Sequence, residues 1–250
     1  MKLNDTFLFG KYQIKNEPPW HIEWKIVHQT DEYQIAQTNM IIDLMAFDAA
    51  EPDNNDNYSK KSGTNKWQLS NIKQFLNSDQ DNWYHPQHQY DAPPIAVNLW
   101  DDSAENLLNP YKNHKGFLYF FSDKEKNLLK EFTFTLANPV TICTAKVWLP
   151  TITQLTGDSN GFSLNPVYEG TQFKACTCLQ SLIKTLDPKC IDAYNIKNVK
   201  YNSFYWTSST EYGSPFVNSV SSLGSLVNDF PYHSNCGIAP CICLPIDFSV

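Results

Sequence analysis

The sequence predicts an α+β fold in which a small, twisted antiparallel sheet is flanked by short helices and long loops. Three observations predict this class. Apolar and polar residues alternate near both ends of the chain, as they do in half-buried strands. Short apolar faces with helical spacing follow helix-capping residues in its middle. Polar, proline-containing stretches without periodicity separate these patterns.

The strands are predicted from the alternation. Near the start of the chain, apolar residues alternate around Gly10 and again on both sides of the polar turn 29–32, which is the pattern of a hairpin. The apolar positions are Phe7, Phe9, Tyr12, Ile14, Trp24, Ile26, Tyr33 and Ile35. Residues 146–149 are strand-like as well, and so is the chain from Val199 onward, through VKYNSFYWTSS, FVNSVSSL and GIAPCICLP.

Short helices are predicted at 70–77, 123–132 and 174–186. Each of these segments places apolar residues three and four positions apart, so that one narrow face can be buried. Ser122 and Glu125 form the S-x-x-E capping box, which marks the start of the second helix.

Residues 51–65 and 78–116 are predicted to be loop excursions. Both stretches are polar, the first contains turn-forming residues and the second several prolines. No internal repeat or linker-like tract divides the chain. We therefore expect one domain over residues 1–250.

Composition and charge exclude several classes of function. The 250 residues are 42% hydrophobic, 14% aromatic and only 18% charged, which excludes an intrinsically disordered chain. The net charge is -7, and all 19 basic residues are lysines, so no guanidinium group can bind phosphate or guanine in bidentate fashion. Nucleic acid and anionic membranes are therefore not expected as partners. No apolar run could span a bilayer and the opening residues lack the apolar region of a signal peptide, so we expect synthesis in the cytoplasm without membrane insertion.

Candidate metal sites do not fit the ligand spacings of known sites. The Asp/Asn-rich stretch 53–57 resembles the start of an EF-hand loop, but Tyr58 stands where that loop needs glycine. His85 and His88 are separated by Pro86, which disfavours the helix that would bring them together. We expect neither a metal nor a cofactor.

Catalytic motifs give no basis for an enzyme. The sequence contains no G-x-S-x-G elbow, Walker motif or G-x-G-x-x-G pattern. The seven cysteines are interpreted as small, buried apolar residues. One alternative stays open, because the spacing of Cys236 and Cys241 resembles the copper-binding cysteine pair of formylglycine-generating enzymes. We predict a protein that is not an enzyme, with a copper-dependent oxidase as the alternative.

Eight motifs in collinear order resemble one family. They are G-K-Y (10–12), W-K-I-V (24–27), M-I-I-D-L-M-A-F-D (40–48), W-Q-L-S-N-I-K-Q-F-L-N (67–77), F-S-D-K-E (121–125), K-V-W-L-P-T-I-T-Q-L (146–155), Y-W-T-S-S (205–209) and G-I-A-P-C-I-C-L (237–244). Over nearly the whole chain, this order resembles a bacterial and phage domain-of-unknown-function family with a C-type-lectin-like fold. That fold is shared with retroelement-diversified receptor-binding proteins and formylglycine-generating enzymes. Where the family usually shows G-V-R-P-A-L, residues 237–242 of this chain contain no arginine.

The resemblance implies a display protein, which is a rigid domain on a particle or cell surface whose C-terminal loops bind a ligand. The version it favours is a phage virion component from a tail, a baseplate or a capsid decoration. A bacterial lectin-like surface adhesin is the alternative. The implied partners are a host surface glycan or protein, or neighbouring virion subunits, and a homo-oligomer stays open.

The composition of residues 201–235 agrees with a binding role. This stretch is rich in aromatic residues, serine and asparagine and contains no lysine, and binding loops favour such residues. We expect Phe204 and Trp206 to lie inside and the loops between Thr210 and Asn235 to form the contact surface. The predicted contact residues are Tyr212, Phe216, Asn218, Asn228, Tyr232 and His233. The loops 51–65 and 78–116 are the alternative location.

Overall fold

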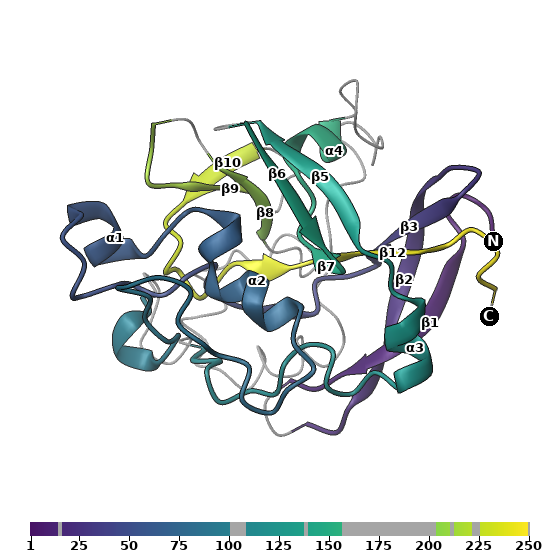
Figure 1. Cartoon of the computed structure of the whole chain (residues 1–250), viewed down its shortest axis with the longest axis horizontal. Coiled ribbons are helices and arrows are strands. Elements are labelled where there is room, and N and C mark those ends of the chain that lie inside the picture. Colours follow the sequence, from purple (N-terminus) through teal and green to yellow (C-terminus); the bar gives the residue numbers. More distant parts are fainter. Residues whose placement is uncertain are drawn as a thin grey trace, which may run out of the picture.

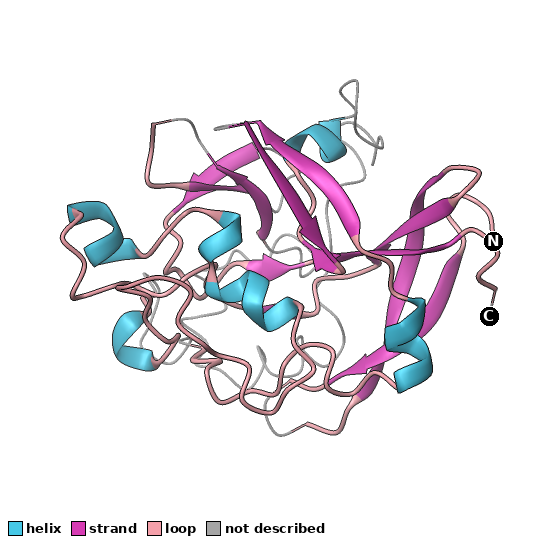
Figure 2. Ribbon diagram, in the orientation of Figure 1, coloured by secondary structure: helices cyan, strands magenta, loops and turns pink. Residues whose placement is uncertain are grey.

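The computed structural model describes residues 1–14, 17–100, 109–137, 140–156, 204–210, 213–221 and 226–249. Within these ranges the chain is mixed α+β, with mostly antiparallel strands and a few short helices joined by long loops (Figure 1, Figure 2). The predicted α+β class is confirmed. None of the helices in these ranges is long and apolar enough to cross a membrane.

Within the described residues, two five-stranded sheets and one hairpin form the β structure. The first sheet has the order β1 (Thr6–Tyr12), β2 (Trp20–Gln29), β3 (Tyr33–Thr38), β12 (Cys241–Pro245) and β7 (Val147–Trp148). The second has the order β10 (Leu226–Asp229), β9 (Val217–Val220), β8 (Tyr205–Thr210), β11 (Gly237–Ile238) and β4 (Asp43–Leu44). The hairpin consists of β5 (Phe132–Ala137) and β6 (Val140–Ala145). Among the described strand pairs, only β8 and β11 run parallel.

An N-terminal segment and a C-terminal segment are paired in both sheets. In each sheet, a strand of one segment lies beside a strand of the other. β3 pairs antiparallel with β12, and the chain that follows β3 brings β4 beside β11, which precedes β12. In Figure 1, β12 crosses the middle of the molecule. The approach is close at Gly237, where a Cβ atom would lie 2.6 Å from Ile41 Cγ2 and 2.8 Å from the Phe204 carbonyl oxygen. Only glycine fits there, because any side chain would meet fixed backbone.

The helices of the described residues are short. They are α1 (Asn57–Ser62), α2 (Asn71–Leu76), α3 (Asp123–Leu128) and α4 (Ile152–Thr156), with single 3-10 turns at Trp67–Leu69 and Ala96–Asn98. Of these, α2 and α4 contact strands. α2 buries Ile72, Phe75 and Leu76, which are the apolar positions of the predicted helix 70–77. That helix is confirmed.

Several sequence predictions need correction. The capping box of Ser122 and Glu125 is present, but α3 ends at Leu128 instead of 132, because Leu129 is extended and Phe132 already pairs in β5. The loop predicted at 51–65 contains α1, which Asp56 caps by accepting a hydrogen bond from Ser59 N. The predicted helix 174–186 lies outside the described residues.

The first strands form as the alternation predicts. β1, β2 and β3 pair antiparallel, and the turn 29–32 joins the last two. β8, β9 and the β11–β12 segment confirm the strands predicted near the C-terminus, and Trp206 is fully buried as expected. The prediction for Phe204 is wrong, since its side chain is 41% exposed at the start of this region.

Glu125 ties α3 to the bulge in β1. Its Oε2 atom accepts hydrogen bonds from Ser122 N and Ser122 Oγ, each 2.7 Å long, and its Oε1 atom accepts one of 2.8 Å from Gly10 N. Gly10 has a φ of 66° and its Cα faces the Phe121 ring, so the strand can bulge here only with glycine. Burial acts to raise the pKa of Glu125, but the hydrogen bonds from Ser122 and Gly10 outweigh it and lower that pKa.

We expect Glu125→Gln to reduce stability by about 1 kcal/mol, or roughly 2 to 4 °C in Tm, because an amide has only one acceptor oxygen. A lowered pKa in the folded state stabilises the protein above the usual glutamate value of 4.5, and this stabilisation is lost as the pH falls through the folded-state pKa. The Tm difference between wild type and variant should therefore be large at about pH 7 and small at about pH 3. A difference that stays constant over this range would contradict the assigned role.

Candidate functional site

Five side chains from three segments form an aromatic cluster at the surface. They are Trp100 from the excursion 78–116, Phe216 directly before β9, and Phe230, Tyr232 and His233 after β10. We call these residues the aromatic cluster. Trp100 is 45% exposed, so the cluster opens to solvent through its ring.

The rings of the aromatic cluster pack in a continuous row. The Trp100 and Tyr232 rings are stacked with their centroids 5.6 Å apart and their planes 12° apart. His233 lies 5.1 Å from Trp100 and 5.9 Å from Phe230 by ring centroids. Phe230 in turn lies 4.5 Å from Phe216. Offset and edge contacts of this kind stabilise aromatic groups beyond the area that they bury.

Backbone hydrogen bonds fix two of these segments to each other. Trp100 N donates to Tyr232 O over 3.1 Å, and Ser234 N donates to Trp100 O over 3.1 Å. The bonds on both sides of Trp100 fix its backbone beside Tyr232, and the stacked rings hold the Trp100 side chain against Tyr232. The cluster is therefore preorganised, which lowers the entropy lost when a partner binds.

The central buried segment, residues 41–50, anchors both parts of the aromatic cluster to the core. Ala50 N donates to Asn98 O over 2.8 Å, two residues before Trp100. Asp48 N donates to Pro231 O over 3.0 Å, next to Tyr232. A hydrogen bond to the central segment thus lies two residues from Trp100 and one residue from Tyr232.

Asp229 positions His233 at the base of the aromatic cluster. The Asp229 Oδ1 atom contacts His233 Nδ1, and it also accepts a 2.8 Å hydrogen bond from Phe230 N. The His233 side chain is only 6% exposed. Its Nε2 atom is buried and has no hydrogen-bond partner among the described residues. The buried His233 ring therefore packs against the other rings on their inner side, and Trp100 and Tyr232 supply the accessible contact area.

The structure brings some of the predicted contact residues together. Phe216, Tyr232 and His233 belong to the aromatic cluster. Asn218 and Asn228 face each other across the β9–β10 ladder, where Asn228 is exposed and Asn218 is 9% exposed. Tyr212 lies outside the described residues.

Sequence reasoning did not select Trp100 and Phe230. Phe230 lies in the aromatic-rich stretch 201–235 and could have been chosen on the same grounds as Tyr232. Trp100 lies more than a hundred residues earlier, in the excursion named as the alternative location. A large aromatic residue in a polar loop was the available signal, but only the fold shows that it meets Tyr232.

The acidic residues near 48–57 form a structural network. Asp48 is fully buried, and its carboxylate accepts hydrogen bonds from Thr64 N (2.7 Å) and Asn71 N (2.8 Å). Burial raises the pKa of Asp48 well above its usual value in spite of these two bonds. Glu51 is buried as well, where Asn54 and His88 contact its carboxylate. Among the described residues, no three His, Cys, Asp or Glu side chains gather closely enough to hold a metal ion.

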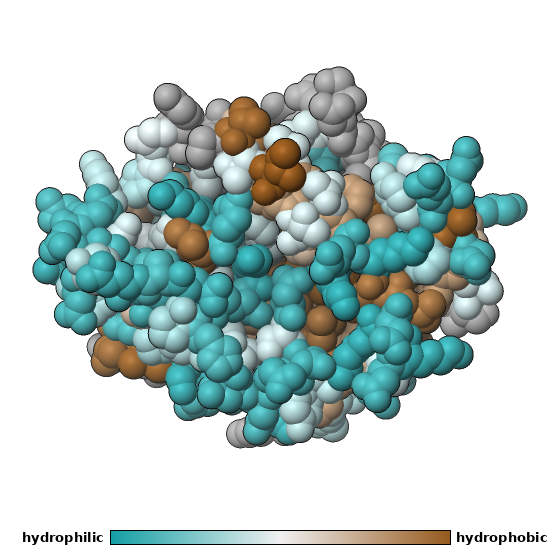
Figure 3. Space-filling view, in the orientation of Figure 1, coloured by the Kyte–Doolittle hydropathy of each residue, from teal (hydrophilic) through white to brown (hydrophobic). Residues whose placement is uncertain are grey.

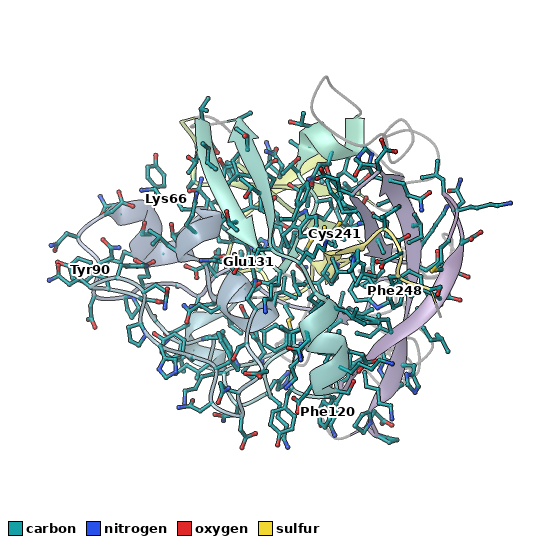
Figure 4. All side chains as sticks on the ribbon, turned by 45° about the vertical axis from the view of Figure 1, so that its right-hand side comes forward. Lys66, Tyr90, Phe120, Glu131, Cys241 and Phe248 are labelled. Carbon is teal, nitrogen blue, oxygen red and sulfur yellow. The ribbon has the colours of Figure 1, made fainter. Side chains whose placement is uncertain are left out.

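The two cysteines of the oxidase alternative lie inside the protein. Cys236 is 1% exposed and Cys241 is 0% exposed, and Cys241 lies deep among the side chains of the core in Figure 4. Burial raises the pKa of both thiols well above the usual value, and the negative charge of Asp229 adds to this for Cys236. Burial raises the pKa of the nearby Tyr205 as well, and Cys241 and Cys236 add to this rise.

We expect Cys236 and Cys241 to resist modification by a thiol reagent in the native protein, because a buried thiol with a raised pKa supplies no accessible thiolate. Peptide mass spectrometry after labelling, with and without denaturant, measures each cysteine separately. Both should be labelled only under denaturing conditions. Rapid labelling of either residue in the folded protein would contradict the structure and would favour the oxidase.

Comparisons with known proteins identify the family. A family model described as Domain of unknown function (DUF6273) matches residues 31–246, so the chain belongs to that family. No curated protein and no solved structure matches the chain significantly.

Proposed function

We propose that this member of the DUF6273 family is a non-catalytic display and binding protein, whose aromatic cluster contacts a partner. The version we favour is a phage virion component of a tail, a baseplate or a capsid decoration, on a C-type-lectin-like fold. Its partner would be a host surface glycan or protein, or a neighbouring virion subunit. A bacterial surface adhesin with the same contact surface is the alternative.

The observation that carries this proposal is the exposed Trp100 ring stacked on Tyr232. An aromatic side chain that is 45% exposed leaves apolar area in water, although the backbone on both sides of it is fixed by hydrogen bonds. Rigid aromatic anchors of this kind are enriched at binding hot spots, because they offer a large contact area at a small entropy cost.

The fold and the thiols support the same proposal. Pairing of β3 with β12 joins the two ends of the chain, and this leaves the excursions between them free to carry binding residues, as expected of a C-type-lectin-like domain. Burial of Cys236 and Cys241 counts against the copper-dependent oxidase, which needs two accessible thiols.

We expect Trp100→Ala and Tyr232→Ala to weaken attachment by about 2 kcal/mol or more, which is roughly 30-fold in affinity. Attachment of the purified protein to bacterial cells or phage particles measures this effect, and the melting temperature shows whether each variant remains folded. Tyr58→Ala is the matched control, because Tyr58 is also an exposed aromatic residue (64%) but lies on α1, outside the cluster.

Two results would overturn the assignment of the contact surface. One is unchanged attachment by stable Trp100 and Tyr232 variants. The other is an equal loss in the Tyr58 variant, which would place the contact surface in residues 51–65, the alternative location, instead of at the aromatic cluster. Mass spectrometry of purified phage particles and of bacterial surface fractions then decides between the virion component and the adhesin, because the protein should be enriched in only one of them.

A further inference from the structure

A second feature, separate from the aromatic cluster, is a group of three carboxyl side chains where the excursion 78–116 meets the central segment. They are Asp48, Glu51 and Asp91, and we call them the carboxyl cluster. Asp48 and Glu51 are each only 1% exposed. A carboxylate that is removed from water needs hydrogen bonds or a positive charge, and otherwise it keeps its proton.

Hydrogen bonds through Asn71 join the two sides of the carboxyl cluster. Asn71 N donates to Asp48 Oδ1 over 2.8 Å, and Asn71 Nδ2 donates to Asp91 Oδ1 over 3.0 Å. A direct contact lies beside this bridge, where Glu51 Oε1 is 3.3 Å from His88 Nε2. Asp91 and His88 belong to the excursion, so the carboxyl cluster holds this part of the excursion against the central segment.

The charges around the carboxyl cluster are mostly negative. Among the described residues, no lysine forms an ion pair with any of its three carboxylates. His88 supplies a positive charge only while its ring is protonated. Besides the three carboxyls themselves, the titratable groups that face the cluster are His88, Asp56, Tyr84 and Tyr111, with Lys66 facing Asp56.

These surroundings favour the protonated form of the two buried members. Burial raises the pKa of Asp48 well above its usual value of 3.8, and the charges of Asp91 and Glu51 add to this rise. Burial also raises the pKa of Glu51 from 4.5, although Asn54 and His88 act against it. Stability that depends on a raised carboxyl pKa is fully present below the unfolded-state value and is lost as the pH rises through the folded-state value.

We propose that the carboxyl cluster is a pH-sensitive contact, which holds the excursion to the central segment while it carries a proton and loosens when that proton is lost. Loss of the proton leaves negative charges on both sides of the contact, with Asp48 and Glu51 on one side and Asp91 on the other. Like charges repel more strongly in the low dielectric of a protein interior than in water. The excursion, which also carries Trp100, is therefore held more firmly at mildly acidic pH than at alkaline pH.

Carbon-13 NMR of the native full chain tests the protonation directly. The carboxyl signals of Asp48 and Glu51 are assigned by their disappearance in Asp48→Asn and Glu51→Gln. We expect at least one of them to remain at the position of a protonated carboxyl at about pH 5.5, where an ordinary Asp or Glu is ionised. Ionised signals for both residues at that pH would overturn the proposal. This measurement needs no partner, so its result does not depend on the proposed attachment.

Hydrogen exchange at about pH 5.5 and pH 8.5 tests whether the contact loosens. After correction for the intrinsic exchange rate, peptides that span residues 84–91 should lose about tenfold or more in protection at the higher pH, because each released proton changes the opening equilibrium by up to tenfold per pH unit. Peptides from β2 should keep their protection. Unchanged protection of residues 84–91 would overturn the proposal.

A matched pair of variants identifies the carboxyl responsible. Glu51→Gln keeps the shape of a protonated glutamate and cannot ionise, so the loss of protection between the two pH values should be smaller than in the wild type. Glu131→Gln makes the same change at an exposed position and should leave that loss unchanged. Melting temperatures show that both variants are folded. An equal loss in the wild type and both variants would reject the role of Glu51 in the contact.

Discussion

The structure depends on one constraint, which is that the backbone of the central segment 41–50 is buried and every polar group on it needs a partner. Ile42 N and Met45 N donate to carbonyl oxygens of Ile238 and Cys236, which bind the segment to the C-terminal strands. Carbonyl oxygens on the same segment accept from side chains far away in sequence, as Met45 O does from Trp206 Nε1 over 2.7 Å. Leaving such groups unpaired would cost as much as a lost hydrogen bond each, so the surrounding loops must fold against the segment.

This constraint also explains where the aromatic cluster is. Ala50 and Asp48 hold the loops that carry Trp100 and Tyr232. Irregular loops ordinarily have few fixed contacts, yet the residues next to Trp100 and Tyr232 are bonded to the segment 41–50, of which residues 41–49 are buried. The aromatic cluster therefore combines loops, which are free to vary in sequence, with hydrogen bonds that hold these loops to the core close to Trp100 and Tyr232.

The sequence predicts the elements that local chemistry determines, and it misses those that depend on distant partners. Alternation was sufficient for β1 to β3, and the Ser122–Glu125 capping box for the start of α3. The β5–β6 hairpin was missed because Phe132 also continues the apolar spacing of the preceding helix, and only pairing with Ala145 decides between helix and strand. This hairpin leaves Val140 and Ile142 exposed, and Figure 3 shows apolar surface over its strands. For the candidate site, composition located Phe216, Tyr232 and His233, but no local pattern could pair Tyr232 with Trp100.

The charge distribution decides what kind of recognition the aromatic cluster can support. Beyond Lys200 the sequence has no lysine and only three acids, and one of them, Asp229, is paired with His233 beneath the rings. Long-range steering needs a surface potential of one sign, to which the residues beyond Lys200 contribute little. Contacts made by Phe216, Phe230 and Tyr232 must instead be driven by apolar contact area and short hydrogen bonds, so they should depend little on salt and show a negative heat-capacity change.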